Sequence, residues 1–174
     1  MILIINGAFG VGKTTVGRLL KERIAGSRLY NPEWAGSVLM RTPFFRFKGA
    51  GTGDFQDIDL WRKSVISGTR IFRGMARGTV IVPMAFSRRD YFDEIVSGMR
   101  RFDGEVRVFC LRAGLPTIRT RLEKRGGEID WPVNKAQDCI EAHKDEHFGE
   151  PVDTEGASAG EVADDILRRL EKGQ

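Results

Sequence analysis

The sequence predicts an α/β fold with a parallel sheet, and two observations carry this prediction. Short apolar runs alternate along the whole chain with longer segments whose apolar residues recur at helical spacing, a pattern typical of repeated strand–helix–strand units. The first run, Ile2 to Ile5, contains no polar residue, as expected for a central strand that is covered on both faces. The 174 residues suit one domain, so we expect a single unit that spans residues 1–174.

The expected strands are the short apolar runs, each bounded by polar or turn-forming residues. The first run leads into a glycine-rich turn, and the second, Arg28-Leu29-Tyr30, is followed directly by Asn31-Pro32. These boundaries matter because Gly, Asn and Pro favour turns over strand interiors. We expect strands at residues 2–6, 28–30, 79–83, 105–111 and 151–154.

The expected helices are the segments in which apolar residues recur three or four positions apart. The first shows such a stripe over residues 16–24, and Gly26 is suited to end it. Asn31 as N-cap and Pro32 at the first helical position predict a further short helix. We expect the longer helices at residues 13–25, 58–77, 87–101, 115–125, 133–146 and 158–172.

Two segments between the second and third strands carry many large apolar side chains. Residues 42–56, TPFFRFKGAGTGDFQ, combine glycines and phenylalanines without a clear period. We predict a loop whose phenylalanines either cap the core or line an apolar part of a substrate. The helix that follows has a broad apolar stripe with helical spacing: Leu60, Trp61, Val65, Ile71, Phe72 and Met75.

The turn after the first strand carries the strongest functional signal. Residues 7–14, GAFGVGKT, match G-x-x-x-x-G-K-[ST], the phosphate-binding loop or P-loop. Glycines at this spacing let backbone N–H groups converge on a polyphosphate, and the following helix adds its N-terminal dipole. Lys13 is suited to reach the β- and γ-phosphates, and the Thr14 hydroxyl is suited to ligate Mg²⁺. We expect a nucleotide to contact Gly7, Ala8, Phe9, Gly10, Val11, Gly12, Lys13, Thr14 and Thr15.

Composition and charge narrow the range of partners. The net charge is +4, and most of the basic residues are arginines, which suit bidentate phosphate recognition. No dense basic run interleaved with aromatic residues occurs, so nucleic acid is not an expected partner. No apolar run reaches the length of about 18 residues that a membrane span needs, and the amphipathic last helix suits packing on the sheet better than a membrane surface. The chain opens on a strand, without the features of a signal peptide, so we expect a cytoplasmic protein. The oligomeric state stays open.

The cysteines and histidines do not form a reactive or metal-binding pattern. Cys110 and Cys139 have neither metal-ligand nor redox-pair spacing and lie in apolar segments, so we expect buried free thiols. His143 and His147 are four residues apart, but no HExxH pattern surrounds them. We therefore interpret both histidines as structural.

Four stretches together point to a family. They are INGAFGVGKTT at 5–15, LYNPEWAG at 29–36, DFQDIDLWR at 54–62 and VIVPMAFSRRDYFDEI at 80–95. The set resembles the tunicamycin-resistance protein family, small P-loop proteins similar in fold to shikimate kinase and other small-molecule and nucleoside-monophosphate kinases. The resemblance implies a five-stranded parallel sheet of order 2-3-1-4-5 flanked by helices, with a lid. It also implies ATP binding and protection against a nucleoside antibiotic that bears a fatty acyl chain.

The resemblance also assigns the lid region, at about 119–135. Arg121 and Arg125 are four residues apart, so they share one face of a helix that ends at Gly126-Gly127. They resemble the arginine pair of nucleoside-monophosphate kinases, in which the first arginine lies near adenine and the second reaches phosphate. We expect Arg121 to contact the nucleotide and Arg125 to take part in catalysis.

The acceptor side departs from the family pattern. Related kinases carry an acid pair after the second strand, where this chain reads Asn31-Pro32-Glu33 with one carboxylate, and Pro83-Met84 end the third strand without an aspartate for Mg²⁺. Glu33 is our candidate for the general base, because ligands bind at this carboxyl edge of open α/β sheets; Asp54, Asp57 and Asp59 are rival acids. We expect the acceptor to contact Asn31, Glu33, Arg41, Phe55, Asp57 and Met84.

Three functions remain open at this stage. The first is an ATP-dependent phosphotransferase that acts on a hydroxyl of a small molecule such as a nucleoside antibiotic. The second is a nucleotide-gated protein that sequesters its ligand without chemistry, which the missing second acid beside Asn31 favours. The third is a metabolic small-molecule kinase with the same fold, because fold alone does not determine function.

Overall fold

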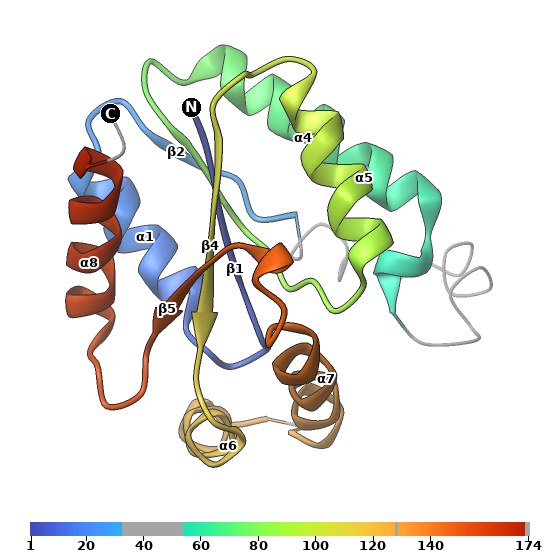
Figure 1. The fold of residues 1–174 in the computed structure, drawn as a ribbon, viewed down its shortest axis with the longest axis vertical. Helices are drawn as coiled ribbons and strands as arrows, with labels where there is room; N and C mark the ends of the chain where they lie inside the picture. Colours follow the sequence, from blue (N-terminus) through green and yellow to red (C-terminus); the bar gives the residue numbers. More distant parts are fainter. Residues whose placement is uncertain (33–53, 128, 173–174) are drawn as a thin grey trace.

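The computed structural model describes residues 1–32, 54–127 and 129–172, and these residues form a parallel sheet flanked by helices. The sheet has five strands in the order β2-β3-β1-β4-β5, and every pair of neighbours is parallel. This order confirms the expected 2-3-1-4-5 topology (Figure 1). The strands are β1 (Ile2–Gly7), β2 (Arg28–Leu29), β3 (Val80–Pro83), β4 (Val106–Arg112) and β5 (Glu150–Asp153).

The helices cover both faces of the sheet and the edge where the strands end. Helices α1 and α8 lie side by side on one face, α4 and α5 on the other, and α6 and α7 lie near the carboxyl end of β4 (Figure 1). The helices are α1 (Lys13–Arg23), α4 (Asp59–Met75), α5 (Arg89–Arg100), α6 (Leu115–Arg125), α7 (Asp130–Ala142) and α8 (Ala159–Lys172). Two short 3₁₀ turns, η1 (Phe55–Asp57) and η2 (Glu146–Phe148), precede α4 and β5.

Strand β1 is the centre of the molecule. All six of its residues are buried, and their side chains alternate between the two faces of the sheet. Leu3 and Ile5 join the core under α1 and α8, while Ile2 and Ile4 join the core under α4 and α5. Burial of each such side chain contributes about 1.5–3 kcal/mol. Because β1 pairs with both β3 and β4, the turn after Gly7 has a fixed place at the carboxyl edge of the sheet.

Helix α4 corrects one sequence-based expectation. Trp61 and Val65 are buried, but Leu60, Ile71 and Met75 are 58%, 62% and 55% exposed. The exposed residues Leu60, Ile71 and Met75 lie along one edge of the apolar stripe, and only the other edge, with Trp61 and Val65, faces the sheet. Helical spacing alone therefore does not identify the buried face.

The region between α6 and β5 differs from the expected single helix at 133–146. Helix α7 begins earlier, at Asp130, because Pro132 is tolerated in a first helical turn. It ends at Ala142, and η2 follows after a turn in which the Asp145 carboxylate accepts a hydrogen bond from the His147 N–H at 2.9 Å. This local cap breaks the longer helix that periodicity suggested.

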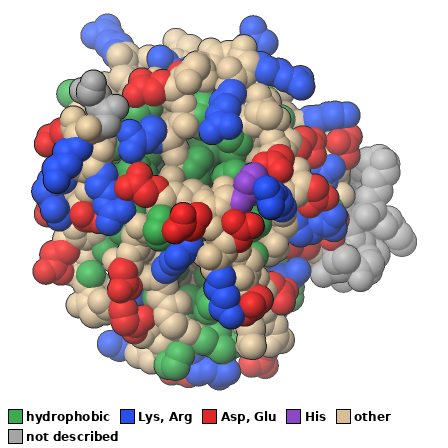
Figure 2. All heavy atoms as spheres, in the orientation of Figure 1, with side chains coloured by type: hydrophobic (Ala, Val, Ile, Leu, Met, Phe, Trp, Pro, Cys, Tyr) green, Lys and Arg blue, Asp and Glu red, His purple; other side chains and the backbone are tan. Residues whose placement is uncertain are grey.

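Two further expectations concern cysteines and membrane spans. Cys110 and Cys139 are buried, and neither forms a disulfide within the part of the chain that the structure describes, as predicted. Within the described ranges, no helix combines the length and the apolar character needed to cross a membrane. On the face shown in Figure 2, basic and acidic side chains are interspersed.

Candidate functional site

The P-loop connects β1 to α1, and its glycines adopt backbone conformations that other residues disfavour. Gly10 has φ +83°, and a Cβ placed there would lie 2.8 Å from Leu122 Cγ of α6. Gly12, with φ +111°, is the N-cap of α1. These positions need glycine because a Cβ is strained at positive φ and, at Gly10, blocked by α6. The loop is therefore packed against α6, the helix that bears the predicted lid arginines.

Lys13 is the charged residue of the loop, and it is buried. Its side chain is 6% exposed, and its Nζ donates a hydrogen bond to the Ala8 carbonyl oxygen at 3.1 Å. The same Nζ lies 5.1 Å from the centroid of the Phe9 ring. The Phe9 ring in turn meets the Trp131 ring of α7 edge to face, at 5.3 Å between centroids. The ammonium group is thus held inside the curve of the loop, where an anion-binding nest places phosphates.

A cavity of about 650 Å³ lies beside the P-loop. It is bounded by the loop, the start of α1, helix α6 and the segment between β5 and α8. Gly7 and Ala8 do not line this cavity. The predicted nucleotide-site residues that line it are Phe9, Gly10, Val11, Gly12, Lys13, Thr14, Thr15, Arg121 and Arg125. Arg121 and Arg125, the predicted lid arginines, therefore line the same cavity as the P-loop.

Arg121 holds the two sides of this cavity together. Its Nη1 donates to the Val11 carbonyl oxygen and to Thr154 Oγ1, each at 3.0 Å, and its Nη2 donates to the Thr154 carbonyl oxygen at 2.7 Å. Thr154 Oγ1 donates to the Arg112 carbonyl oxygen at 3.0 Å. Charge-assisted bonds of this kind are stronger than neutral ones, so they fix the plane of the guanidinium at the cavity wall.

Asn6 fixes the start of the P-loop to its surroundings, and sequence reasoning missed it. Its Oδ1 accepts hydrogen bonds from the Gly7 N–H at 2.7 Å and the Phe86 N–H at 3.1 Å. Its Nδ2 donates to the Phe148 carbonyl oxygen at 3.0 Å. The side chain is fully buried, so losing one partner would leave an unsatisfied group. The available signal was a polar residue that ends an otherwise apolar strand.

The predicted acceptor residues differ in burial, and the structure describes only some of them. Asn31 is partly buried directly after β2. Met84 is fully buried in the core formed with β3 and α5, so its side chain presents no surface to a ligand in this conformation. Phe55 lies in η1, but its side chain is not described. Glu33 and Arg41 lie outside the described residues, as does the stretch 42–53.

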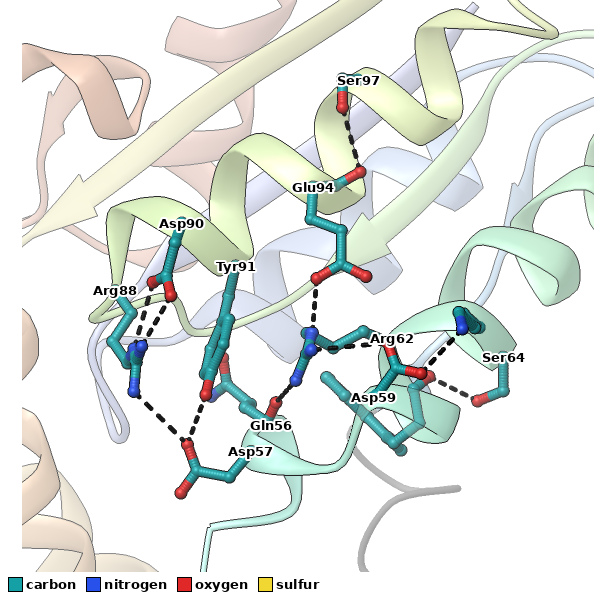
Figure 3. Close-up of polar contacts among 12 residues, drawn as sticks. Gln56, Asp57, Asp59, Arg62, Ser64, Arg88, Asp90, Tyr91, Glu94 and Ser97 are labelled. Atoms are coloured by element: carbon teal, nitrogen blue, oxygen red, sulfur yellow. Dashed lines mark hydrogen bonds and ion pairs between the residues drawn. The ribbon is translucent and has the colours of Figure 1, made fainter.

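Asp57 belongs to a polar network that ties η1 to α5 (Figure 3). The Tyr91 hydroxyl donates to Asp57 Oδ1 at 2.8 Å, and the Tyr91 ring lies between the guanidinium carbons of Arg62 and Arg88, at 4.3 and 4.1 Å from its centroid. Arg62 also bonds Glu94 Oε2 at 2.6 Å. Burial and the hydrogen bond to Asp57 raise the pKa of Tyr91, so its hydroxyl keeps the proton that it donates.

Asp54 is the buried acid of this region. It is 7% exposed, its Oδ1 accepts the Gln56 N–H at 2.9 Å, and its Oδ2 lies 3.3 Å from Lys135 Nζ of α7. Asp59, another rival acid, is exposed and pairs with Lys63 at 2.8 Å. Asp54 therefore joins η1 to α7.

The two histidines have different environments. His143 is 3% exposed, and burial lowers its pKa to about 4. His147 is partly exposed and lies 2.6 Å from Asp93 Oδ1. Across residues 1–32, 54–127 and 129–172, no group of three or more His, Cys, Asp or Glu side chains is arranged to hold a metal ion.

Comparisons with known proteins agree with this geometry. Residues 2–147 match the family model described as AAA domain. No curated protein matches the chain. The structure of the Deinococcus radiodurans tunicamycin resistance protein is 27% identical, with a TM-score of 0.77 over 98% of this chain and 95% of that chain.

Two kinases share the fold at lower identity. A gluconokinase from Sinorhizobium meliloti 1021 is 20% identical, with a TM-score of 0.68 over 98% of this chain and 91% of that chain. A shikimate kinase from Bacteroides thetaiotaomicron is 16% identical, with a TM-score of 0.62 over 99% of this chain and 96% of that chain. Because the matched family model covers most of the chain, the protein belongs to the AAA domain family, and its fold is that of the P-loop small-molecule kinases.

Proposed function

We propose that the protein binds ATP with Mg²⁺ and transfers the γ-phosphoryl group to a hydroxyl of a small molecule. The observation that supports this most is the cavity of about 650 Å³ in which the P-loop, Lys13, Arg121 and Arg125 meet. Phosphoryl transfer needs charge neutralisation and alignment more than covalent help from the protein. The N–H groups of the P-loop, the buried Lys13 and two arginines on the cavity wall can supply both the charge neutralisation and the alignment.

Each residue has a role in the proposed step. The acceptor oxygen attacks the γ-phosphorus, the bond from that phosphorus to the β–γ bridging oxygen breaks, and ADP leaves. Lys13, the loop N–H groups and Arg125 stabilise the charge that spreads over the phosphoryl oxygens. The hydroxyl proton passes to a carboxylate, for which Glu33 is the candidate and Asp54 the buried rival. Arg121 positions the nucleotide at the cavity wall.

The described residues suit a magnesium ion that arrives with the nucleotide. Thr14 lines the cavity beside Lys13 and offers one hydroxyl ligand. Mg²⁺ commonly keeps several waters and takes its other ligands from substrate phosphates, so one protein ligand is compatible with it. When bound, the ion neutralises phosphate charge.

We further propose that residues 1–174 form one domain with a lid at about 119–135. The described helices pack on one sheet or beside its carboxyl edge. ATP as substrate is consistent with a cytoplasmic protein. We propose no nucleic-acid partner, which the mixed charges of the face in Figure 2 support.

The acceptor that we favour is a nucleoside antibiotic of the tunicamycin type. The similarity to the tunicamycin resistance protein at 27% identity over nearly the whole chain supports this choice. The gluconokinase and shikimate kinase neighbours keep a metabolic hydroxyl compound as the other acceptor class.

Mass spectrometry of tunicamycin after incubation with the protein, Mg²⁺ and ATP tests the proposal. We expect a gain of one phosphoryl mass that Lys13→Ala abolishes. The matched control is Lys21→Ala, because Lys21 is an exposed lysine on the same helix. A panel of sugars, shikimate and nucleosides, read by ADP release, identifies a different acceptor. A folded protein that binds ATP and turns over no compound of either set would refute phosphoryl transfer to them.

A second function, sequestration without transfer, has its own supporting observation. One carboxylate, Glu33, follows β2 directly, and buried apolar residues Met84, Ala85 and Phe86 follow β3 where related kinases place an acid. A sequestering protein would bind the antibiotic more tightly with ATP and return it unmodified. Equilibrium dialysis followed by mass measurement separates this outcome from transfer.

A further inference from the structure

The last residue of β4 is Arg112, and its side chain lies on the face of the sheet opposite α1 and α8. Asn6 and Cys110 are paired in the β1–β4 register, and Arg112 is two residues beyond Cys110. Side chains two residues apart on a strand share a face, so Arg112 lies on the same face as Asn6 and Cys110. That face is the one on which Asn6 contacts Phe86 and Phe148.

Two nitrogens of the Arg112 guanidinium lack hydrogen-bond partners among the described residues. Its Nε and Nη2 are buried, and in the part of the chain that the structure describes neither has a hydrogen-bond partner. No ion pair among those residues includes Arg112 either. Such burial is costly because a desolvated charge needs hydrogen bonds and a counter-charge. A ligand that supplies both would explain why the residue is an arginine.

A small cavity adjoins this arginine at the P-loop. Its volume is about 160 Å³, and its lining comes from the P-loop, the end of β4 and the end of α7: Ala8, Leu111, Arg112, Ala113, Ile140, His143 and Lys144. Since one water in the liquid occupies about 30 Å³, the cavity has room for a small anionic group with some water.

Lys13 is a second cation close to this cavity. Lys13 Nζ donates to the carbonyl oxygen of Ala8, which lines the cavity. Burial, together with the charges of Lys13 and Arg112, lowers the pKa of His143 to about 4. His143 Nε2 lies 2.6 Å from the Phe86 carbonyl oxygen, which can only accept, so Nε2 carries the proton and the ring is neutral at pH 7. Two cations beside a neutral imidazole favour the binding of an oxyanion.

We propose that Arg112 is an oxyanion-binding residue that works with Lys13 from the face of the sheet opposite α1 and α8. The oxyanion is either the γ-phosphate of the nucleotide or a phosphate or carboxylate group of the acceptor. This inference rests on the proposed function, since both sources belong to the transfer site. Arg112 would hold the anion through its guanidinium while the bonds from Thr154 to the Arg112 carbonyl oxygen fix its backbone, at 2.9 and 3.0 Å.

The test compares Arg112→Met, Arg112→Lys and the control Arg107→Met. Arg107 lies on the same strand but pairs with Glu150 at the surface, at 3.4 Å. Affinities are measured by calorimetry for MgATP, for MgADP, and for inorganic phosphate in the presence of MgADP. Thermal unfolding without ligand is measured in parallel. None of these readouts requires turnover, so failure of the proposed transfer reaction is distinguishable from failure of this inference.

The two possible sources of the oxyanion predict different changes in binding affinity. If the source is the γ-phosphate, Arg112→Met weakens MgATP binding at least tenfold and leaves MgADP binding within about twofold. If the source is the acceptor, both nucleotides bind as before and the binding of inorganic phosphate is lost. In either case Arg112→Lys restores part of the affinity, and Arg107→Met changes nothing.

The unliganded stability distinguishes binding from a structural role. Because Arg112→Met removes an uncompensated buried charge, the melting temperature without ligand should stay equal or rise. A variant that melts lower than the wild type and binds all three ligands unchanged would overturn the proposal. Unchanged affinities with unchanged stability would overturn it as well.

Discussion

Asp54 and Lys135 form an ion pair, with 3.3 Å between Oδ2 and Nζ, that joins η1 to α7 across the carboxyl edge of the sheet. The Asp54 side chain is 10% exposed and that of Lys135 is 23% exposed. The pair links the segment before α4 to α7, whose first residues fall within the predicted lid region.

Replacing Lys135 should loosen this connection. We expect Lys135→Met to lower the free energy of unfolding by about 1–3 kcal/mol, because a buried carboxylate loses its cation. Urea denaturation measures the change. Lys144→Met is the control, since Lys144 pairs with exposed Glu141 at the surface, where pairs contribute about 0–1 kcal/mol. Equal losses in the free energy of unfolding would show that the Asp54–Lys135 pair stabilises the protein no more than a surface pair does.

Replacing Gly10 should damage the P-loop directly. Gly10→Ala places a Cβ at positive φ and 2.8 Å from Leu122 Cγ, so we expect a loss of about 1–3 kcal/mol in stability and at least tenfold weaker MgATP binding. Gly74→Ala in α4 is the matched control. Its Cβ would meet no atom within 4 Å, so it should stabilise the helix by about 0.5–1 kcal/mol. Thermal unfolding and calorimetric titration measure both; normal ATP binding by Gly10→Ala would contradict the described loop geometry.

Arg121 and Thr154 should behave as one unit. We expect Arg121→Ala to weaken MgATP binding tenfold or more, because the wall of the cavity loses the bonds to Val11 and Thr154. Thr154→Val removes the hydroxyl that Arg121 contacts. The double variant should then cost less than the sum of the two single variants, with a coupling energy of about 0.5–3 kcal/mol. Strict additivity of the measured affinities would mean that the two side chains act independently.

The buried imidazole of His143 should make the fold sensitive to acid. Its pKa is lowered to about 4 by burial, whereas in the unfolded chain it is about 6.5. Between these values the unfolded state binds more protons, so stability rises with pH across this window and is lost as the pH falls through it. The contribution that is lost is about 3 kcal/mol.

Urea denaturation between pH 4 and pH 7.5 measures this dependence. His143→Gln should flatten the profile over that range. His147→Gln should not, because His147 is partly exposed beside Asp93. A His143→Gln protein that keeps the full slope would assign the acid sensitivity to other groups.

The local parts of the molecule could be predicted from the sequence. The P-loop, the strand–helix alternation and the order of the sheet follow from short patterns and from a resemblance carried by short stretches. Helix α6 begins and ends at the expected residues, Leu115 and Arg125. The P-loop and α6 depend on neighbours in the chain, whereas the order of the sheet was implied by the family resemblance.

Contacts between residues far apart in the sequence could not be predicted from local patterns. Asn6 meets Phe148 from the far end of the chain, and Asp54 meets Lys135. Neither contact leaves a local pattern, because it depends on how distant elements pack. Met84 was predicted to contact the acceptor and is instead buried in the core. The apolar spacing of α4 likewise could not show that Ile71 and Met75 would remain exposed.

The edge-to-face contact between Phe9 and Trp131 has a practical consequence. Trp131 is 37% exposed, and its partner ring belongs to the P-loop and lies 5.1 Å from Lys13 Nζ. Indole emission responds to nearby charge and to solvent, so filling the loop with phosphate alters the surroundings of this fluorophore. The protein thus carries an intrinsic optical reporter of its own loop. Stopped-flow fluorescence, with Trp131→Phe as the blank, can follow nucleotide arrival and departure in real time without a label.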